Sequence, residues 1–213
     1  MSKKEVTIIN YGLGNILSVE RALQSAGSKV KVLSDYNEIR HSNKIILPGV
    51  GSFGYGINKL KSLKLFDTLI DCADKGIPVL GICLGMQLLF ESSYEFGKYK
   101  GLSLLEGEVL PLKNMTKLKI KIPHINWSKL EKPKNKIWEK SILRNIDEKS
   151  DSFYFIHSYS VKAKNLENVL AFSRYNDVLI TSVVQKENVF GCQFHPEKSA
   201  KSGFKIIRVF LEI

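Results

Sequence analysis

The sequence predicts an α/β fold with a doubly wound, mostly parallel central sheet and antiparallel edge strands. Over the first 95 residues, short apolar runs alternate with segments whose apolar residues recur at helical spacing, which is typical of a parallel sheet covered by helices. From about residue 100 to about residue 190, the pattern changes to short strands and turns, which favours antiparallel strands at one sheet edge. A chain of 213 residues can bury one sizeable core, so we expect a single domain over residues 1–213.

The individual elements follow from apolar spacing and from the residues that end each run. Apolar residues at positions 16, 19, 23 and 26 predict a helix over 16–26, which Gly27 ends. The other helical segments are expected at 57–74, at 86–91, and at 203–211, where Phe204, Ile207 and Phe210 face inward. Strands are expected at 6–10, 30–33, 44–47 and 78–82, with a glycine-rich turn at 49–56.

The net charge of +11 is the unusual bulk property of the chain. Such a charge suggests nucleic-acid binding through phosphate contacts. Here the lysines are scattered, and no RNA- or DNA-binding motif accompanies them. Over residues 117–122 lysines alternate with apolar residues, which predicts a half-exposed strand, and the mixed stretch 129–140 predicts an exposed connection. A lysine-rich solvated surface is the better interpretation, and no nucleic-acid partner is expected.

Cysteine content and hydropathy favour a cytoplasmic protein that does not enter a membrane. Three cysteines, Cys72, Cys83 and Cys192, are too few and too uneven in number for a disulfide framework, and they suit a reducing compartment. The basic residues 1–4 precede an apolar run, 6–9, that is too short for the core of a signal peptide. The longest largely apolar stretch, 79–90, falls well below the roughly 20 residues that span a bilayer.

Cys83 is the first candidate for chemistry. It stands in Gly81-Ile82-Cys83-Leu84-Gly85, between an apolar strand-like run and a helix-like run. A nucleophile at a sharp turn between strand and helix is a nucleophile elbow, and the flanking glycines permit the tight backbone. The start of the helix supplies partial positive charge and unpaired N–H groups, which favour a thiolate over a thiol. The competing interpretation is an ordinary buried cysteine.

A second cluster lies near the C-terminus, in Phe194-His195-Pro196-Glu197. The apolar run before it predicts a buried strand, which Pro196 ends. In extended backbone His195 and Glu197 point to the same side, so Glu197 can orient one ring nitrogen while the other faces a thiol. On its own this pair also fits a solvated loop. Together with Cys83 it forms the triad of an activated nucleophile: Cys83, His195 and Glu197.

These motifs resemble a known family. Gly-Ile-Cys-Leu-Gly-Met-Gln (81–87) and Phe-His-Pro-Glu-Lys-Ser (194–199) are similar to the signatures of class I, triad-type glutamine amidotransferases. Within that family, the blocks at 10–15, 48–54, 123–127 and 153–159 resemble the glutaminase subunits of imidazole glycerol phosphate synthases, which serve histidine biosynthesis. The matches extend from residue 8 to residue 199, which is almost the whole chain.

The resemblance implies a reaction and a substrate site. Cys83 would attack the carboxamide carbon of L-glutamine, His195 would take the thiol proton and give it to the leaving ammonia, and water would hydrolyse the thioester to glutamate. The N–H of Leu84 and one from the 49–51 segment would hold the oxyanion. Glu95 would bind the α-amino group of glutamine, and the backbone of residues 157–159 would bind its α-carboxylate. The expected substrate-binding residues are Gly49, Val50, Gly51, Leu84, Gln87, Glu95, His157, Ser158 and Tyr159.

The resemblance also implies a partner. Ammonia protonates in water and is then useless as a nucleophile, so family members dock on a synthase and pass ammonia along a protected route. That synthase is a (β/α)8 barrel that forms a heterodimer with the glutaminase and makes imidazole glycerol phosphate, with AICAR as co-product. Trp127, Tyr154 and Lys198 match family positions near this interface. No cofactor and no metal are expected.

Two departures from the family pattern leave alternatives open. Asn10 stands where the family usually has Asp, and Asn126-Trp127-Ser128 stands where it has Gly-Trp-Asn. Asn is the next most tolerant residue after Gly at positive φ, so the backbone can be retained. Both changes lie in segments tied to the partner side. They keep open a paralogous glutaminase that supplies ammonia for amidation of a cell-surface sugar and, in another class, a non-catalytic regulatory or scaffold subunit.

One competing motif is a dinucleotide fingerprint. Gly49-x-Gly51-x-x-Gly54 follows a strand and has Asp71 at a plausible distance. However, it follows the third expected strand and not the first, and Pro48 stiffens its entry. A cofactor-binding fold would also leave the cysteine and histidine motifs without a purpose. In the resembled family this segment is the oxyanion strand, and we prefer this interpretation to a dinucleotide site.

Overall fold

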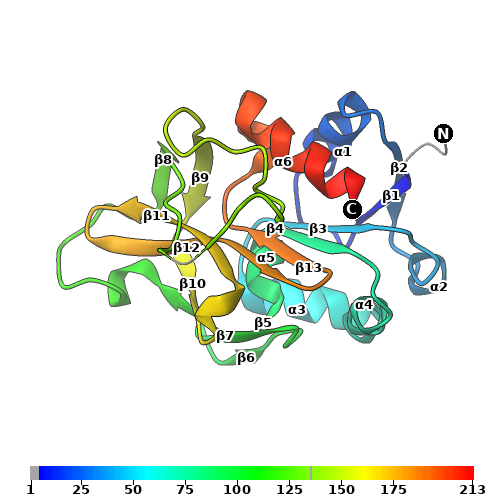
Figure 1. Cartoon of the computed structure of the whole chain (residues 1–213). Helices are drawn as coiled ribbons and strands as arrows, with labels where there is room; N and C mark the ends of the chain where they lie inside the picture. Colours follow the sequence, from blue (N-terminus) through cyan, green and yellow to red (C-terminus); the bar gives the residue numbers. More distant parts are fainter. Residues whose placement is uncertain (1–4, 135) are drawn as a thin grey trace.

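The computed structural model describes residues 5–134 and 136–213, so the basic residues 1–4 and position 135 of the expected connection 129–140 lie outside it. A seven-stranded sheet runs through the described residues in the order β11-β12-β13-β4-β3-β1-β2 (Figure 1). Neighbours from β13 to β2 are parallel, whereas β11, β12 and β13 pair antiparallel. This confirms the expected mostly parallel sheet with antiparallel strands at one edge. The strands are β1 (Glu5–Ile9), β2 (Lys29–Leu33), β3 (Ile45–Gly49), β4 (Val79–Cys83), β11 (Val169–Tyr175), β12 (Val178–Lys186) and β13 (Val189–Cys192).

Helices cover both faces of this sheet, as expected for a doubly wound fold (Figure 1). On one face α1 (Ile16–Ser25) and α6 (Ala200–Glu212) contribute to a buried apolar cluster. On the other face α3 (Phe53–Ser62), α4 (Leu65–Asp74) and α5 (Leu84–Leu88) contribute to a second cluster, and the short helix α2 (Tyr36–Ile39) adds its buried isoleucine to it. Within residues 5–134 and 136–213, no helix is long and apolar enough to cross a membrane.

Two smaller sheets account for the rest of the strand-rich region. One has the order β10-β7-β5-β6 and is built from β5 (Phe90–Ser93), β6 (Tyr99–Lys100), β7 (Leu105–Pro111) and β10 (Tyr159–Ala163). The other is an antiparallel ribbon of β8 (His124–Ser128) and β9 (Phe153–His157). Short 3-10 turns lie at Leu112–Asn114, Leu166–Asn168 and Pro196–Lys198. The strands expected from 100 to 190 are therefore divided among three sheets and do not all extend the central one.

The helix expected over 57–74 is in fact two helices, and the preceding turn is shorter than predicted. Lys64 has a φ of 59°, a left-handed conformation that separates α3 from α4. α3 begins at Phe53, inside the expected turn 49–56, and the Glu95 carboxylate accepts the Phe53 N–H at 2.7 Å. The run 86–91 is helical only to Leu88, after which Phe90 enters β5 beside β7.

Residues 117–122, which the structure describes, form no strand, contrary to the prediction. Side chains hold this segment instead. The Thr116 hydroxyl donates to Asp177 and accepts the N–H of Leu118, and the Tyr175 hydroxyl donates to the Lys121 carbonyl. Leu118 is 59% exposed, so the alternation of lysine and apolar residues does not mark a buried face here.

Candidate active site

Cys83 occupies the sharp turn between β4 and α5. Its φ of 54° and ψ of −109° lie in a sparsely populated backbone region, which costs about 1–3 kcal/mol. The flanking glycines are needed because the turn presses against its neighbours. A Cβ on Gly85 would overlap the carbonyl oxygen of Leu47 in β3, and a Cβ on Gly81 would lie 2.6 Å from the Met86 nitrogen. The structure thus has the elbow geometry that the sequence predicted.

His195 and Glu197 form a buried pair next to this turn. Nδ1 of His195 lies 2.8 Å from Oε1 of Glu197, and the two side chains are 4% and 2% exposed. The backbone differs from the expectation, since Glu197 lies in the 3-10 turn Pro196–Lys198 and not in an extended strand end. The tight turn directly after His195 brings the carboxylate back onto the imidazole ring.

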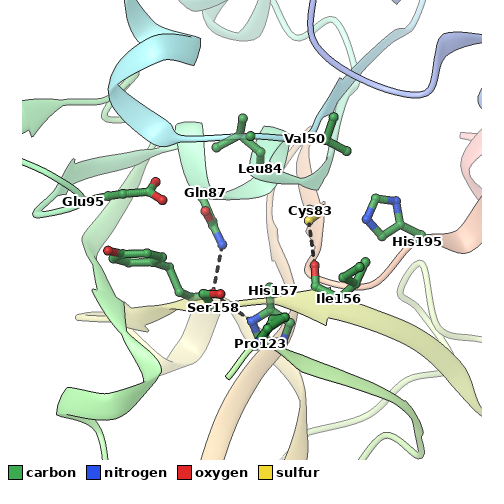
Figure 2. A pocket seen from close by; sticks show the side chains of 12 residues that line it. Val50, Cys83, Leu84, Gln87, Glu95, Pro123, Ile156, His157, Ser158 and His195 are labelled. Atoms are coloured by element: carbon green, nitrogen blue, oxygen red, sulfur yellow. Dashed lines mark hydrogen bonds between the residues drawn. The ribbon is translucent and has the colours of Figure 1, made fainter. Parts of the chain in front are cut away.

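The electrostatics of the pair favour proton uptake by His195. Burial lowers the pKa of His195, but the Cys83 and Glu197 side chains outweigh it and raise this pKa above its ordinary value. With Nδ1 donating to Glu197, Nε2 is the acceptor, and among the described residues it is buried without a hydrogen-bond partner. The Cys83 thiol donates to the Ile156 carbonyl at 3.9 Å (Figure 2). A free acceptor therefore lies beside the thiol.

A pocket of about 300 Å³ opens in front of Cys83, a size typical of small-molecule sites. Figure 2 shows Glu95 and His195 toward opposite ends, with Cys83 and Gln87 between them. Of the expected substrate-binding residues, only Gly49 does not line the pocket. The lining residues are Val50, Gly51, Cys83, Leu84, Gln87, Glu95, Pro123, Ile156, His157, Ser158, Tyr159 and His195.

Gly49 lies behind the pocket, at the end of β3 and in register with Cys83. A Cβ there would meet the Tyr11 hydroxyl and the Leu84 side chain, so only glycine allows this approach. Gly54 serves packing as well, because it lies inside α3 against the ring of Tyr99. Gly49 thus allows close packing at the elbow, Gly54 allows it against Tyr99, and Gly51 has a φ of 104°, which together account for the fingerprint-like spacing without a dinucleotide.

Gln87 and Glu95 are both anchored by hydrogen bonds at the pocket wall. Nε2 of Gln87 donates to the Tyr159 carbonyl and to Oε1 of Gln193, each at 3.0 Å. Burial raises the pKa of Glu95, and the hydrogen bond from the Phe53 N–H offsets this only in part. Each side chain therefore has a structural role besides facing the pocket.

Three residues near the site were missed by sequence reasoning. Nε2 of the fully buried Gln193 donates to Sγ of Cys83 at 3.7 Å. The Tyr11 hydroxyl donates to the Pro48 carbonyl at 2.8 Å, and Nδ1 of His124 lies 3.0 Å from Nε2 of His157. Only Gln193 had a usable signal, since it stands two residues before His195.

The three expected interface residues lie outside the pocket. Trp127 in β8 is 48% exposed, and its ring centroid is 6.0 Å from that of Tyr154 in β9. Lys198 is exposed in the turn that carries Glu197. Asn126, which replaces a family glycine, lies in β8 and is not among the residues with positive φ, so the substitution needs no left-handed backbone.

Comparisons with known proteins agree with the fold and show the family. Residues 7–212 match the family model "Glutamine amidotransferase class-I". The structure titled PurLQS from Thermotoga maritima superposes with a TM-score of 0.73 at 21% identity, covering 99% of this chain and 98% of that chain, which supports the fold alone. The protein class defined by this fold and site is the class I glutamine amidotransferases.

The sequence relatives specify the group within that class. The imidazole glycerol phosphate synthase subunit HisH of Lactococcus lactis is 42% identical over 209 residues, 98% of each chain. HisH 1 of Legionella pneumophila is 42% identical over 211 residues, 98% of this chain and 99% of the relative. The chain belongs to the class I glutamine amidotransferases, a family of enzymes, and within it to the HisH subunits of imidazole glycerol phosphate synthase.

Proposed function

We propose that this chain hydrolyses L-glutamine to glutamate and ammonia through a thioester on Cys83. The observation that carries the proposal is Cys83 at a strained elbow, beside a buried His195–Glu197 pair and in the wall of a small-molecule pocket. Nε2 of His195 takes the thiol proton, sulfur attacks the carboxamide carbon, and the protonated ring then donates to the leaving ammonia. Water, activated by the same ring, hydrolyses the thioester.

The pocket walls supply the remaining roles in this proposal. The N–H of Leu84 and one N–H from the 49–51 segment hold the oxyanion, and each such donor is worth about 10²–10³ in rate. Glu95 binds the α-amino group of the substrate, and Gln87 contacts the body of the substrate. The backbone of residues 157–159 binds the α-carboxylate. Convergence of these residues on one pocket supports the assignment.

We further propose that the ammonia passes to a synthase subunit, a cytoplasmic (β/α)8 barrel that makes imidazole glycerol phosphate and AICAR in histidine biosynthesis. The names of the relatives support this acceptor and do not favour the paralogue that would serve amidation of a cell-surface sugar. The complete set of Cys83, His195 and Glu197 speaks against a non-catalytic scaffold. Trp127 and the partly exposed Tyr154, whose ring centroids lie 6.0 Å apart, are proposed to contact the partner together with the exposed Lys198.

A single substitution tests the proposal. Cys83→Ser is expected to abolish glutamate release from glutamine, because oxygen replaces the polarisable thiolate with little change in volume. Synthesis driven by added ammonia in the complex should survive. Cys72→Ser should keep both activities, since Cys72 is buried in α4, where its Sγ contacts the Ile39 carbonyl, and does not line the pocket. If Cys83→Ser still hydrolysed glutamine, the proposed thioester intermediate on Cys83 would be refuted. Loss of ammonia-driven synthesis would mean that Cys83 serves the partner.

A further inference from the structure

A line of side-chain amides connects the Cys83 sulfur to the backbone of the pocket wall. Nε2 of Gln193 donates to Sγ of Cys83 at 3.7 Å, and its Oε1 accepts from Nε2 of Gln87 at 3.0 Å. Nε2 of Gln87 also donates to the Tyr159 carbonyl at 3.0 Å. Gln193 is fully buried and Gln87 is 5% exposed at the pocket wall, so the Gln193 amide in particular is removed from water.

The Tyr159 carbonyl fixes the direction of every bond in this line. A carbonyl oxygen can only accept, so Gln87 must turn its NH₂ group toward it. The same NH₂ group contacts Gln193, which must therefore present its oxygen to Gln87 and its own NH₂ group to Cys83. The second lone pair of that carbonyl is used by Nδ1 of His157 at 2.8 Å. The amide of Gln193 is thus held as a donor to sulfur.

Two contacts of Sγ favour opposite protonation states of Cys83. The Ile156 carbonyl accepts the proton of the thiol, whereas the Gln193 NH₂ group is a donor, which a negatively charged sulfur accepts more strongly. When the S–H bond breaks, the electron pair stays on sulfur and the proton forms an N–H bond at Nε2 of His195, so no other reactant is required. Only the Gln193 contact gains strength in this step.

We infer that Gln193 is a further catalytic residue, whose side-chain amide holds the Cys83 sulfur as a thiolate aimed into the pocket. The inference rests on the proposed role of Cys83 as the nucleophile of a glutaminase. It assigns Gln87 a second role, that of a positioning residue that prevents the Gln193 amide from turning its oxygen toward sulfur.

The test is the pH dependence of Cys83 alkylation by iodoacetamide in the full chain, followed by mass spectrometry. Gln193→Met keeps the volume and removes the donor, and Gln193→Glu places an oxygen acceptor against sulfur. Both should move the alkylation midpoint to higher pH and slow alkylation at neutral pH about ten- to a hundredfold, with Gln193→Glu the slower. The matched control is Gln185→Met in β12, whose amide accepts the Ile142 N–H at 3.2 Å. It should leave the profile unchanged.

A midpoint in Gln193→Met equal to that of the unsubstituted chain would overturn the inference and leave the proposed function intact. If the midpoint shifts in Gln193→Met as expected but the unsubstituted chain releases no glutamate from glutamine even with its loaded partner, the contact between Gln193 and the Cys83 thiolate stands, whereas the proposed function and the catalytic role of Gln193 are overturned. Because Gln193 is fully buried, a second measurement avoids substituting it. In the unsubstituted chain, the NMR chemical shift of the Gln193 NH₂ group should change with pH at the same midpoint as Cys83 alkylation. In Cys83→Ser, this shift should not change over the same pH range. A signal that does not follow this midpoint also overturns the inference.

Discussion

His195 and Glu197 differ in what they contribute to the proposed reaction, because only His195 exchanges a proton with Cys83. His195→Ala should reduce glutamine turnover almost as far as Cys83→Ser. Glu197→Gln should reduce it less, since the ring keeps a partner at Nδ1 but loses the charge that favours its protonated form. Glutamate release measures both effects. Equal losses in the two variants, or loss of ammonia-driven synthesis in the complex, would contradict these roles.

His124 and His157 form a second pair, which should make stability depend on pH. Burial lowers the pKa of His124 to about 4, and burial together with the neighbouring His124 lowers that of His157 to about 3. In the unfolded chain both rings bind protons near pH 6.5, whereas in the folded chain they do not until pH approaches 4. The unfolded state therefore binds more protons, and the free energy of unfolding falls as pH falls, by about 2 kcal/mol per ring from about pH 7.5 to about pH 5.

Urea denaturation at a series of pH values checks this prediction. His124 stacks between Phe155 and Tyr175, so His124→Phe suits the site and removes one titrating ring. Its stability should vary less with pH than that of the unsubstituted chain, even if its stability at neutral pH is lower. The matched control is His41→Gln, because His41 is exposed, and it should keep the original pH dependence. Identical slopes in all three proteins would show that the buried pair does not titrate on unfolding.

At the scale of elements, the elbow depends on the close approach of α5 to β3. A Cβ on Gly85 would overlap the Leu47 carbonyl, so Gly85→Ala should lower the free energy of unfolding by about 1–3 kcal/mol and displace Cys83. In α3, a Cβ on Gly56 would make ordinary contacts of 3.4 Å with Leu88, so Gly56→Ala should leave stability equal or higher. Chemical denaturation measures both. A Gly85→Ala variant as stable as Gly56→Ala would contradict the packing argument.

The sequence predicted well those elements that are determined by residues close together in the chain. The elbow follows from Gly81 and Gly85 on either side of Cys83, and the helix at 16–25 follows from apolar spacing alone. The start of α3 was missed because its first N–H binds Glu95, which is 42 positions away. The false strand at 117–122 arose because a hydrogen bond to Asp177, 61 positions from Thr116, decides that segment.

The same division applies to the site. Cys83, His195 and Glu197 were found because each stands in a motif of a few adjacent residues. Tyr11 and His124 were not, since each acts through a hydrogen bond to a residue of another strand. Gln193 was also missed, although it stands two residues before His195 and so beside the motif. A polar residue that matters only through a hydrogen-bond partner distant in sequence cannot be recognised from a single sequence.

Across the whole molecule, the pocket opens beside a surface that carries exposed apolar side chains. On the β8–β9 ribbon Ile125 and Trp127 are 54% and 48% exposed, and Ile156, 37% exposed, lies both on this ribbon and in the pocket wall. Val50, on the opposite wall, is 43% exposed. A partner that covers the ribbon would reach the segment expected to supply an oxyanion donor.

The isolated chain is therefore expected to be a poor glutaminase that a barrel partner carrying its ligand activates. Pro48 and Gly49 are held by Tyr11 and by packing on Leu84, whereas Val50 is exposed and Gly51 has a φ of 104°. The outer part of the segment can thus place its N–H groups differently in free and bound states.

A loaded partner that binds the competent arrangement more tightly shifts the population toward it. Because one oxyanion donor is worth about 10²–10³ in rate, activation of at least that size is expected. Glutamate release should be measured for the chain alone, with the barrel, and with the barrel plus its nucleotide ligand, and Trp127→Ala should require more barrel for the same activation. Full activity of the isolated chain, unchanged by partner and ligand, would indicate a free-standing amidase whose oxyanion donors are already in place.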